Sequence, residues 1–310
     1  MIDVAASRSA AERALLVVPR PELGTVTVTG RDRVAWLNGL VTCELAKLGP
    51  GAGAYGLAVS KTGKVLAELF VLASAERLVV AARRDRIAAL VEHFDKHLVM
   101  EDVELADASD ALAWLFTIGP AGDEALARAR ARGAEAARVD WTGKGDAVAI
   151  AVNAGDADAL VAELAAIPGA CVAVPEALPT LEVLWGLPRF GVDYGEENVP
   201  HEASLEKLAV SFSKGCYLGQ EAVFMLEARG HAKKHLARLD VEGAEPPERG
   251  AAVTLPDGTA VGEVTRAVSV DGGAVALAYV KHKHAQPGAA LAVGGRAARL
   301  VDLAARPATR

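Results

Sequence analysis

Cysteine is scarce in this chain of 310 residues, which has only three, at Cys43, Cys171 and Cys216. The number is odd and no CxxC pair occurs, so the pattern is not that of a disulfide scaffold and indicates a reduced, cytoplasmic protein. A resident iron–sulfur cluster, which usually needs four thiolates, is disfavoured for the same reason. Neither an H-E-x-x-H sequence nor an EF-hand loop is present, and we expect no bound metal ion.

Long apolar runs and an excess of positive charge are also lacking. No stretch reaches the roughly 18 uncharged apolar residues that a membrane-spanning helix needs. The N-terminus has an acid at Asp3 and only a short apolar run over 14–19, which makes a poor signal peptide. We therefore expect a cytoplasmic protein without membrane contact. The net charge of −7 disfavours a general nucleic-acid-binding surface, so direct nucleic-acid binding is not expected.

The chain does contain enough apolar residues, 52%, for a sizeable core, and its length exceeds that of a usual single domain. With an aromatic share of only 5%, this core is expected to consist mainly of Leu, Val and Ala. Alternating strands and helices, joined in part by hairpins, predict two successive α+β units. The expected elements are strands 25–29, 54–60, 65–73, 77–82 and 112–118 and helices 33–40, 123–132 and 156–166, with a further helix after Asp85 and a hairpin around 143–145.

The amino-acid composition changes twice in the second half of the chain. Residues 187–200 are rich in Gly, Pro, Asp, Glu and Asn and read as an ordered crossing segment. After about residue 235, turn signals are spaced evenly among short Val, Ala and Leu runs, which is typical of a small antiparallel barrel. We therefore expect an α+β protein with units at roughly 1–110 and 111–234, followed by a C-terminal β-barrel over 235–310.

One short segment carries most of the chemistry in the sequence: KGCYLGQE, residues 214–221. Gly215 and Gly219 permit backbone conformations that a Cβ forbids, which would present Cys216 on a tight turn. A thiol close to Lys214 and just before a helix start is expected to have a lowered pKa and more thiolate. The alternative from the residues alone is a buried cysteine in a packed loop.

The run KGCYLGQE resembles the signature of the YgfZ family, K-G-C-Y/F-x-G-Q-E, at every fixed position. That family is a branch of the T-protein (aminomethyltransferase) superfamily. Two further segments agree with it: residues 186–193 resemble the superfamily's G-x-P-x-x-G segment, and residues 30–42 resemble its opening, G-x-D-x-x-x-(W/F)-L-x-x-L-x-T. The resemblance spans roughly residues 22–302, and its most specific part is the segment around Cys216.

The resemblance implies two ferredoxin-like units and a barrel around a central channel that accommodates folate. It implies a tetrahydrofolate-binding accessory protein for iron–sulfur cluster assembly or repair, acting also on tRNA modification through iron–sulfur enzymes. Iron–sulfur client proteins or assembly factors would be its partners. Cys216 would be the reactive thiol and Lys214 its activator. The remaining implied residues are the signature-loop positions Gly215, Tyr217, Gly219, Gln220 and Glu221 and the cofactor-binding positions Asn38, Tyr55 and Arg229.

The sequence departs from the superfamily's pattern at three places. The paired aspartates after the first hairpin turn are replaced by Ala67-Glu68, and we expect Glu68 to be a solvent-facing strand residue, the alternative being a displaced acid. Leu184 stands where a pterin-anchoring glutamate is expected, so Leu184→Glu should tighten folate binding, and Glu182 would compensate only after a backbone shift. Met225 replaces a frequent arginine. Two alternatives stay open: a tetrahydrofolate-dependent aminomethyltransferase or demethylase, and a scaffold without folate.

Two basic segments have more than one interpretation. Residues 229–235 could receive the glutamyl tail of a folate or an RNA phosphate, or could be a solvated strand entrance. Residues 281–284, Lys-His-Lys-His, are expected to form a surface hairpin end and not a metal site. Trp36, Trp114, Cys43 and Cys171 lie in apolar contexts and are expected in the core.

Overall fold

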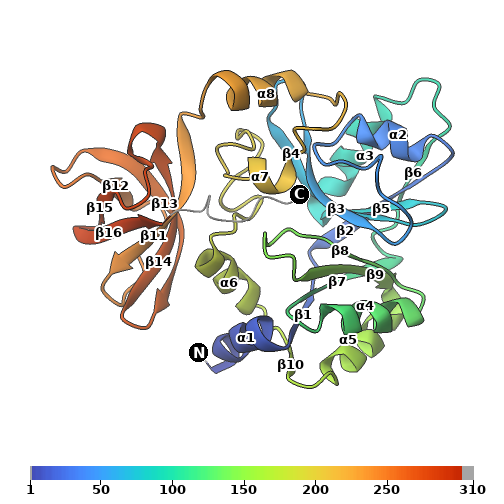
Figure 1. Ribbon diagram of the computed structural model, residues 1–310, viewed down its shortest axis with the longest axis horizontal. Helices are drawn as coiled ribbons and strands as arrows, with labels where there is room; N and C mark the ends of the chain where they lie inside the picture. The colour runs from blue at the N-terminus through green and yellow to red at the C-terminus, as the bar shows by residue number, and fades with distance from the viewer. Residues whose placement is uncertain (1, 302–310) are drawn as a thin grey trace.

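The computed structural model describes residues 2–301 and shows two α+β units at one side of the molecule and a β-barrel at the other (Figure 1). The first unit is a five-stranded sheet in the order β3-β4-β5-β2-β6. Its neighbouring strands all pair antiparallel. Its elements are β2 (Leu23–Thr29), α2 (Arg33–Asn38), β3 (Gly53–Val59), β4 (Val65–Ala73), β5 (Leu78–Arg83), α3 (Ile87–Asp95) and β6 (Glu104–Asp107).

The second unit has the sheet order β10-β1-β7-β9-β8. Its first strand comes from the very start of the chain, because β1 pairs antiparallel with β7 and parallel with β10. The expected division between the units at residue 110 therefore does not hold for β1, which precedes residue 110 and belongs to the second sheet. Four consecutive residues of β1 are buried, as expected for a strand covered on both faces. The elements are β1 (Leu15–Pro19), β7 (Leu112–Ile118), α4 (Gly122–Ala131), β8 (Glu135–Arg138), β9 (Ala147–Asn153), α5 (Ala157–Ala165) and β10 (Ala170–Val172).

The expected C-terminal barrel is confirmed: six antiparallel strands close in the order β11-β14-β13-β12-β15-β16. Its strands range from three to 11 residues, and Val, Ala and Leu side chains fill its core. None of the helices within residues 2–301 is long and apolar enough to cross a membrane. The barrel elements are β11 (Lys234–Glu242), β12 (Ala252–Thr254), β13 (Ala260–Val270), β14 (Gly273–Lys281), the turn η3 (His282–His284), β15 (Ala290–Val293) and β16 (Arg296–Val301).

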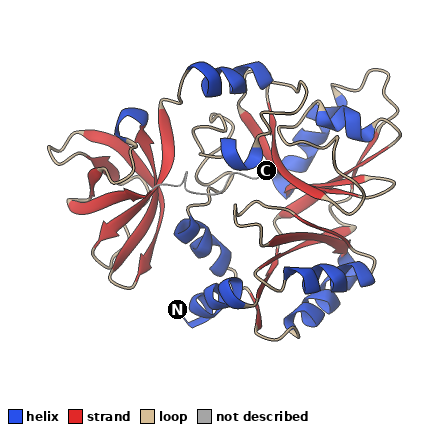
Figure 2. Cartoon of the chain, in the orientation of Figure 1, coloured by secondary structure: helices blue, strands red, loops and turns tan. Residues whose placement is uncertain are grey.

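Four further helices surround and connect these bodies (Figures 1 and 2). Three of them were not predicted: the short α7, α1, which packs on β1 and β10, and α6, which lies between the barrel and the second unit. The helix expected after residue 220 is present as α8, and it bridges the first unit and the barrel at the top of Figure 1. The four are α1 (Ile2–Arg13), α6 (Ala177–Trp185), α7 (Glu206–Ala209) and α8 (Gln220–Arg229).

The two sheets share one apolar core, which joins them into a single body. The rings of Phe70 and Phe116, one from each unit, lie 4.7 Å apart in an edge-to-face arrangement. Trp114 Nε1 donates a hydrogen bond of 2.8 Å to Thr25 Oγ1 across the same interface. The core position expected for Trp114 is thereby confirmed.

Candidate functional site: the signature loop and the central cavity

The segment over residues 211–219, which we call the signature loop, is fastened to the first unit by Lys214. The Lys214 side chain is buried, and its Nζ donates to the carbonyl oxygens of Asn38 at 2.7 Å, Val41 at 2.8 Å and Cys43 at 2.5 Å. Asn38 ends α2, so the ammonium also lies at the negative end of that helix. Burial lowers the pKa of Lys214 to about 8.

Backbone hydrogen bonds dock the rest of the signature loop on the same segment. Ser211 N donates to Thr42 O at 2.9 Å, and Leu218 N donates to Gly39 O at 2.9 Å. Gly219 then adopts a φ of +78° in front of α8, and a Cβ there would lie 2.2 Å from the carbonyl oxygen of Ser60. Glycine is therefore required at this position by both conformation and space.

Cys216 is the exposed cysteine of the three, whereas Cys43 is buried and Cys171 is partly buried. Burial raises the pKa of the Cys43 thiol to about 12, so that residue is an inert packing group. The interpretation of Cys216 as a packed loop residue is excluded by its exposure. The expected activation by Lys214 is not what the geometry shows, because all three N–H donors of Lys214 are directed at carbonyl oxygens.

The other signature positions have distinct environments. Tyr217 is buried in the core between the sheets, and Lys214 Nζ lies 5.3 Å from its ring centre. Gln220 and Glu221 begin α8, where an acid faces the positive end of the helix. Gly215 is exposed and has an ordinary negative φ, and a Cβ there would meet no atom within 4 Å. Neither strain nor crowding inside the chain explains the glycine at 215.

A polar cavity lies between the two sheets, the crossing segment and α6. The space left between its side chains is about 20 Å³, room for about one water molecule. A pterin ring therefore requires side chains of the cavity to move. The lining residues are Arg20, Tyr55, Glu68, Phe70, Trp141, Glu182, Leu187, Pro188, Arg189 and Leu205.

Glu68 is directed into this cavity and not to bulk solvent, so the expectation of a solvent-facing strand residue is wrong. Tyr55, from the neighbouring strand β3, donates a hydrogen bond of 2.6 Å from its hydroxyl to Glu68 Oε1. Desolvation raises the pKa of the Glu68 carboxyl above its ordinary value, against the opposing effect of the Tyr55 hydrogen bond. Glu68 is thus a carboxyl group that can hold or release a proton inside the cavity.

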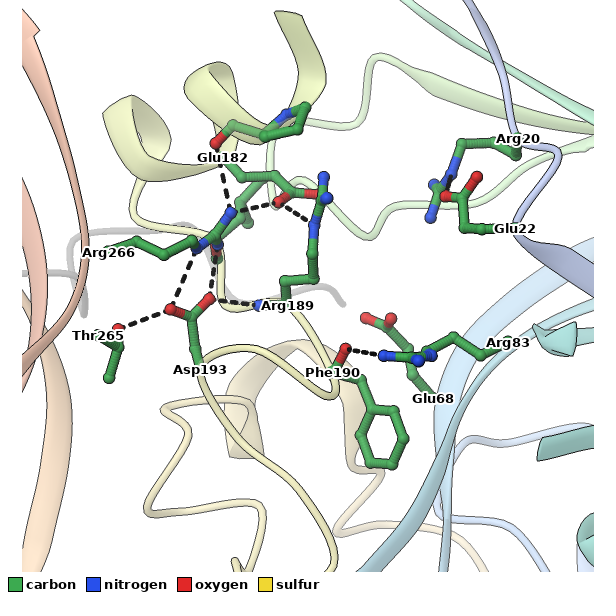
Figure 3. A network of polar contacts seen from close by, with 12 residues as sticks. Arg20, Glu22, Glu68, Arg83, Glu182, Arg189, Phe190, Asp193, Thr265 and Arg266 are labelled. Atoms are coloured by element: carbon green, nitrogen blue, oxygen red, sulfur yellow. Dashed lines mark hydrogen bonds and ion pairs between the residues drawn. The ribbon is translucent and has the colours of Figure 1, made fainter. Parts of the chain in front are cut away.

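On the other wall, α6 presents Glu182 to the cavity (Figure 3), whereas Leu184 is not among the residues that line it. The Glu182 carboxylate accepts from Arg189 Nε at 2.8 Å and from Arg266 Nη1 at 2.9 Å. Leu184 packs partly against Leu236 and Val275 of the barrel. The acid therefore reaches the cavity without any backbone shift, which corrects the expectation drawn from the alignment of Leu184.

Arg266 connects the barrel to the cavity wall. Its Nη2 lies 2.6 Å from Asp193 Oδ2, and the neighbouring Thr265 Oγ1 donates to Asp193 Oδ1 at 2.6 Å. A register shift in β13 between Val264 and Arg266 lets two consecutive side chains reach the same carboxylate (Figure 3). Asp193 also accepts from the backbone N–H of Arg189 at 2.8 Å, so the crossing segment, the barrel and α6 meet in one charged network.

The three expected cofactor-binding residues have different positions. Tyr55 lines the cavity. Asn38 does not, because its Oδ1 accepts a hydrogen bond of 2.8 Å from Leu45 N and closes the loop after α2. Arg229 ends α8, and its side chain lies outside the described part of the structure. Met225, the replaced arginine position, is 53% exposed on α8.

Sequence reasoning missed the cavity positions of Glu68, Glu182 and Arg189, and the contact of Arg266 with Glu182. For Glu68 a signal existed, since it shares strand parity with Phe70 and Leu72, both of which face the core between the sheets. No comparable signal existed for Arg266, which comes from the barrel and reaches the cavity wall through a bulge.

Comparison with known proteins agrees with this architecture. Residues 4–148 match the family model of the GCVT N-terminal domain. The tRNA-modifying protein YgfZ of Vibrio vulnificus strain CMCP6 is 31% identical over 225 residues, 70% of this chain and 67% of that protein. The aminomethyltransferase of Streptomyces avermitilis is 27% identical over 86% of this chain and 78% of that protein. The fold is that of the glycine cleavage system aminomethyltransferase T from Bartonella henselae, with a TM-score of 0.82 at 19% identity, covering 99% of this chain and 91% of that chain. The chain therefore belongs to the YgfZ family, within the T-protein superfamily.

Proposed function

We propose that this protein binds tetrahydrofolate between its two α+β units and supports the assembly or repair of iron–sulfur clusters, with Cys216 as the group on which that support depends. The observation that carries the proposal is the placement of Cys216. It is an exposed thiol on a loop that the buried Lys214 fixes to the first unit. A fixed, exposed thiol is suited to contact a partner protein or its cluster, whereas a buried one is not.

The chemistry of the central cavity supports tetrahydrofolate as the ligand. The polar edge of a pterin offers N–H donors and a carbonyl acceptor, and the cavity offers the carboxylates of Glu68 and Glu182 and the guanidinium groups of Arg20 and Arg189. Because the cavity is small, we expect binding to displace at least one of these arginines. The residues of this chain would then bind and orient the ligand, with Glu68 placed to hold a proton.

A relative of this chain is named a tRNA-modifying protein. The net charge of −7 makes direct binding of tRNA phosphates unfavourable, and we propose that any effect on tRNA passes through iron–sulfur enzymes. Iron–sulfur client proteins or assembly factors are accordingly the partners that we propose, in the cytoplasm.

Expression of variants in cells that lack their own family member tests the role of Cys216. We expect wild-type protein and Cys171→Ser to restore the activity of the host's iron–sulfur enzymes, and Cys216→Ser to fail. Cys171→Ser is the matched control, because it removes a thiol that is only partly exposed and outside the loop. Full restoration by Cys216→Ser, at equal protein levels, would contradict the proposed role.

Glu68 favours a second candidate function, a tetrahydrofolate-dependent aminomethyltransferase or demethylase. A cavity carboxyl group with a raised pKa can act as a general acid or base, which typically contributes about 10²–10⁴-fold to a rate. A reconstituted glycine-cleavage assay separates the two candidates. We expect no aminomethyl transfer, and robust transfer that Glu68→Gln abolishes would establish the enzyme instead.

A further inference from the structure

Four histidines, His201, His231, His235 and His282, meet where α8 joins the barrel; we call them the junction histidines. The rings of His231 and His282 stack with their centres 3.6 Å apart and their planes at 17°. His235 Nε2 lies 2.8 Å from His282 Nδ1, and His235 Nδ1 lies 3.1 Å from the carbonyl oxygen of His201. The rings of His231, His235 and His282 and the carbonyl oxygen of His201 thus connect the residues just after the crossing segment, the start of β11 and the turn η3.

The hydrogen-bond directions in this cluster fix its protonation. A carbonyl oxygen can only accept, so His235 Nδ1 carries a proton toward His201 O. In a neutral His235 ring, Nε2 is then an acceptor, and His282 Nδ1 must donate to it. One added proton is tolerated. If it binds to His235 Nε2, that atom donates to His282 Nδ1, which becomes an acceptor when the neutral His282 carries its proton on Nε2. When His235 and His282 each carry an added proton, both are cations, and the N–H groups at His235 Nε2 and His282 Nδ1 face each other at 2.8 Å.

His201 extends the cluster toward the signature loop. Its Nε2 lies 3.3 Å from Glu227 Oε2 on α8, while its buried Nδ1 has no hydrogen-bond partner among the residues that the structure describes. Its ring lies 6.3 Å from that of Phe212, which in turn lies 5.2 Å from Phe224 of α8. A proton on Nδ1 would be an unsatisfied buried donor, although the Glu227 carboxylate would favour the added charge.

Most of the other charged groups at the junction are basic. Lys233 and Lys234 flank His235 on the same segment, and Lys234 Nζ lies 4.3 Å from the ring centre of Tyr279. Glu202 accepts from Asn198 Nδ2 at 3.0 Å in the crossing segment. Around His282 the neighbours in sequence are Lys281, Lys283 and His284. Among the described residues, His235 and His282 have no ion pair with a carboxylate to offset a second positive charge.

We propose that the junction histidines form a pH-sensitive latch, which holds the barrel against the crossing segment and α8 when the rings are neutral and releases it when both His235 and His282 are protonated. Burial, and then the neighbouring His282, lower the pKa of His235; burial, and then His231, lower the pKa of His282. The ordinary pKa of histidine is about 6.5. A histidine whose pKa is lower in the closed form than in the open form stabilises the closed form at a pH above about 6.5, and this stabilisation is lost as the pH falls below about 6.5.

Backbone amides at the junction report directly on the latch. His282 N donates to Lys233 O at 2.9 Å, and Leu236 N donates to Glu202 O at 2.8 Å. Hydrogen-exchange protection factors correct for the intrinsic pH dependence of exchange. For each proton that the junction gains on opening, the protection factors of these two amides should fall by about tenfold with each pH unit below about 6. The amides of β7 and β9 in the second unit should keep their protection.

His282→Phe is the deciding variant, because it keeps a ring to stack on His231 and cannot be protonated. We expect its junction amides to remain protected at pH 5. His97→Phe is the matched control; it alters a histidine pair on the first unit, His93 and His97, whose rings lie 5.3 Å apart, and should open like the wild type.

Two results would overturn the latch. One is equal junction protection at pH 5 and pH 7.5 in the wild type, and the other is the same loss of protection in His282→Phe as in the wild type. If His282→Phe does not fold, ring-nitrogen NMR of the wild-type protein decides the matter. The latch requires His235 and His282 to titrate below about 6.5 together with the loss of protection, and titration without that loss would exclude it.

Discussion

The ammonium group of Lys214 lies 2.7 Å from the carbonyl oxygen of Asn38, a residue 176 positions earlier in the chain. Together with the bonds to Val41 and Cys43, this contact makes Lys214 a structural part of the signature loop and not the activator of Cys216. Lys214 therefore fixes the loop on which Cys216 is exposed.

Removal of this anchor should destabilise the protein. Lys214→Met leaves three carbonyl oxygens without their charged donor, and we expect a loss of about 3 kcal/mol or more in the free energy of unfolding. Urea denaturation measures it, with Lys61→Met, an exposed lysine of the hairpin turn, as the control. A loss in Lys214→Met no larger than in Lys61→Met would show that the three bonds do not hold the loop.

The two loop glycines should separate stability from function. Gly219→Ala places a Cβ 2.2 Å from Ser60 O at a φ of +78°, and we expect it to cost about 1–3 kcal/mol. Gly215→Ala meets no atom within 4 Å and should change stability by only a few tenths of a kcal/mol. If Gly215→Ala nevertheless fails to support iron–sulfur enzymes, a partner approaches the backbone beside Cys216. Equal stability losses in the two variants would contradict this reading.

The Arg266 network should show strong coupling between the barrel and the crossing segment. Arg266→Met leaves the buried Asp193 carboxylate without its guanidinium, and we expect a cost of about 3–5 kcal/mol. The double variant Arg266→Met, Asp193→Asn should recover part of this loss, because it removes the uncompensated charge. Additive losses in the double-mutant cycle would mean that the two side chains do not interact.

Glu68 should make stability depend on pH. A carboxyl group whose pKa is raised in the folded state disfavours folding increasingly as the pH rises above its unfolded value of about 4.3. Glu68→Gln removes this effect, so the variant should gain stability relative to the wild type between pH 5 and pH 7.5. Denaturation at both pH values tests it against Glu76→Gln, an exposed control. A difference from the wild type that is the same at both pH values would contradict a raised pKa.

Much of the fold was predictable because its elements carry local signals. Residues 25–29 of the first unit alternate clearly, and several turns of the barrel contain glycine. Three helices escaped prediction: α7, which has only four residues, and α1 and α6, which were missed for opposite reasons. Residues 2–13 are polar and rich in alanine, whereas residues 177–185 are apolar apart from Thr180 and Glu182 and contain Pro179, so neither shows an amphipathic stripe. The pairing of β1 with the second sheet is a long-range contact that no local pattern encodes.

The site was predictable only in part. The specific signature led to Cys216 and its loop, and Tyr55 does line the cavity. The role of Lys214 could not be foreseen, because its partners are backbone oxygens and leave no mark in residue type. Glu68 shares strand parity with Phe70, a signal for the core side that our expectation of a solvent-facing residue did not use. Only the structure shows that this core encloses a polar cavity.

Calorimetric titration of the pure protein with tetrahydrofolate tests the central claim most directly. The account predicts saturable heat for the wild type, weaker binding for Glu182→Gln, and no gain for Leu184→Glu, because Leu184 packs partly against the barrel while Glu182 lines the cavity. No heat at millimolar ligand for the wild type would contradict folate binding and leave a scaffold without folate as the function of the fold.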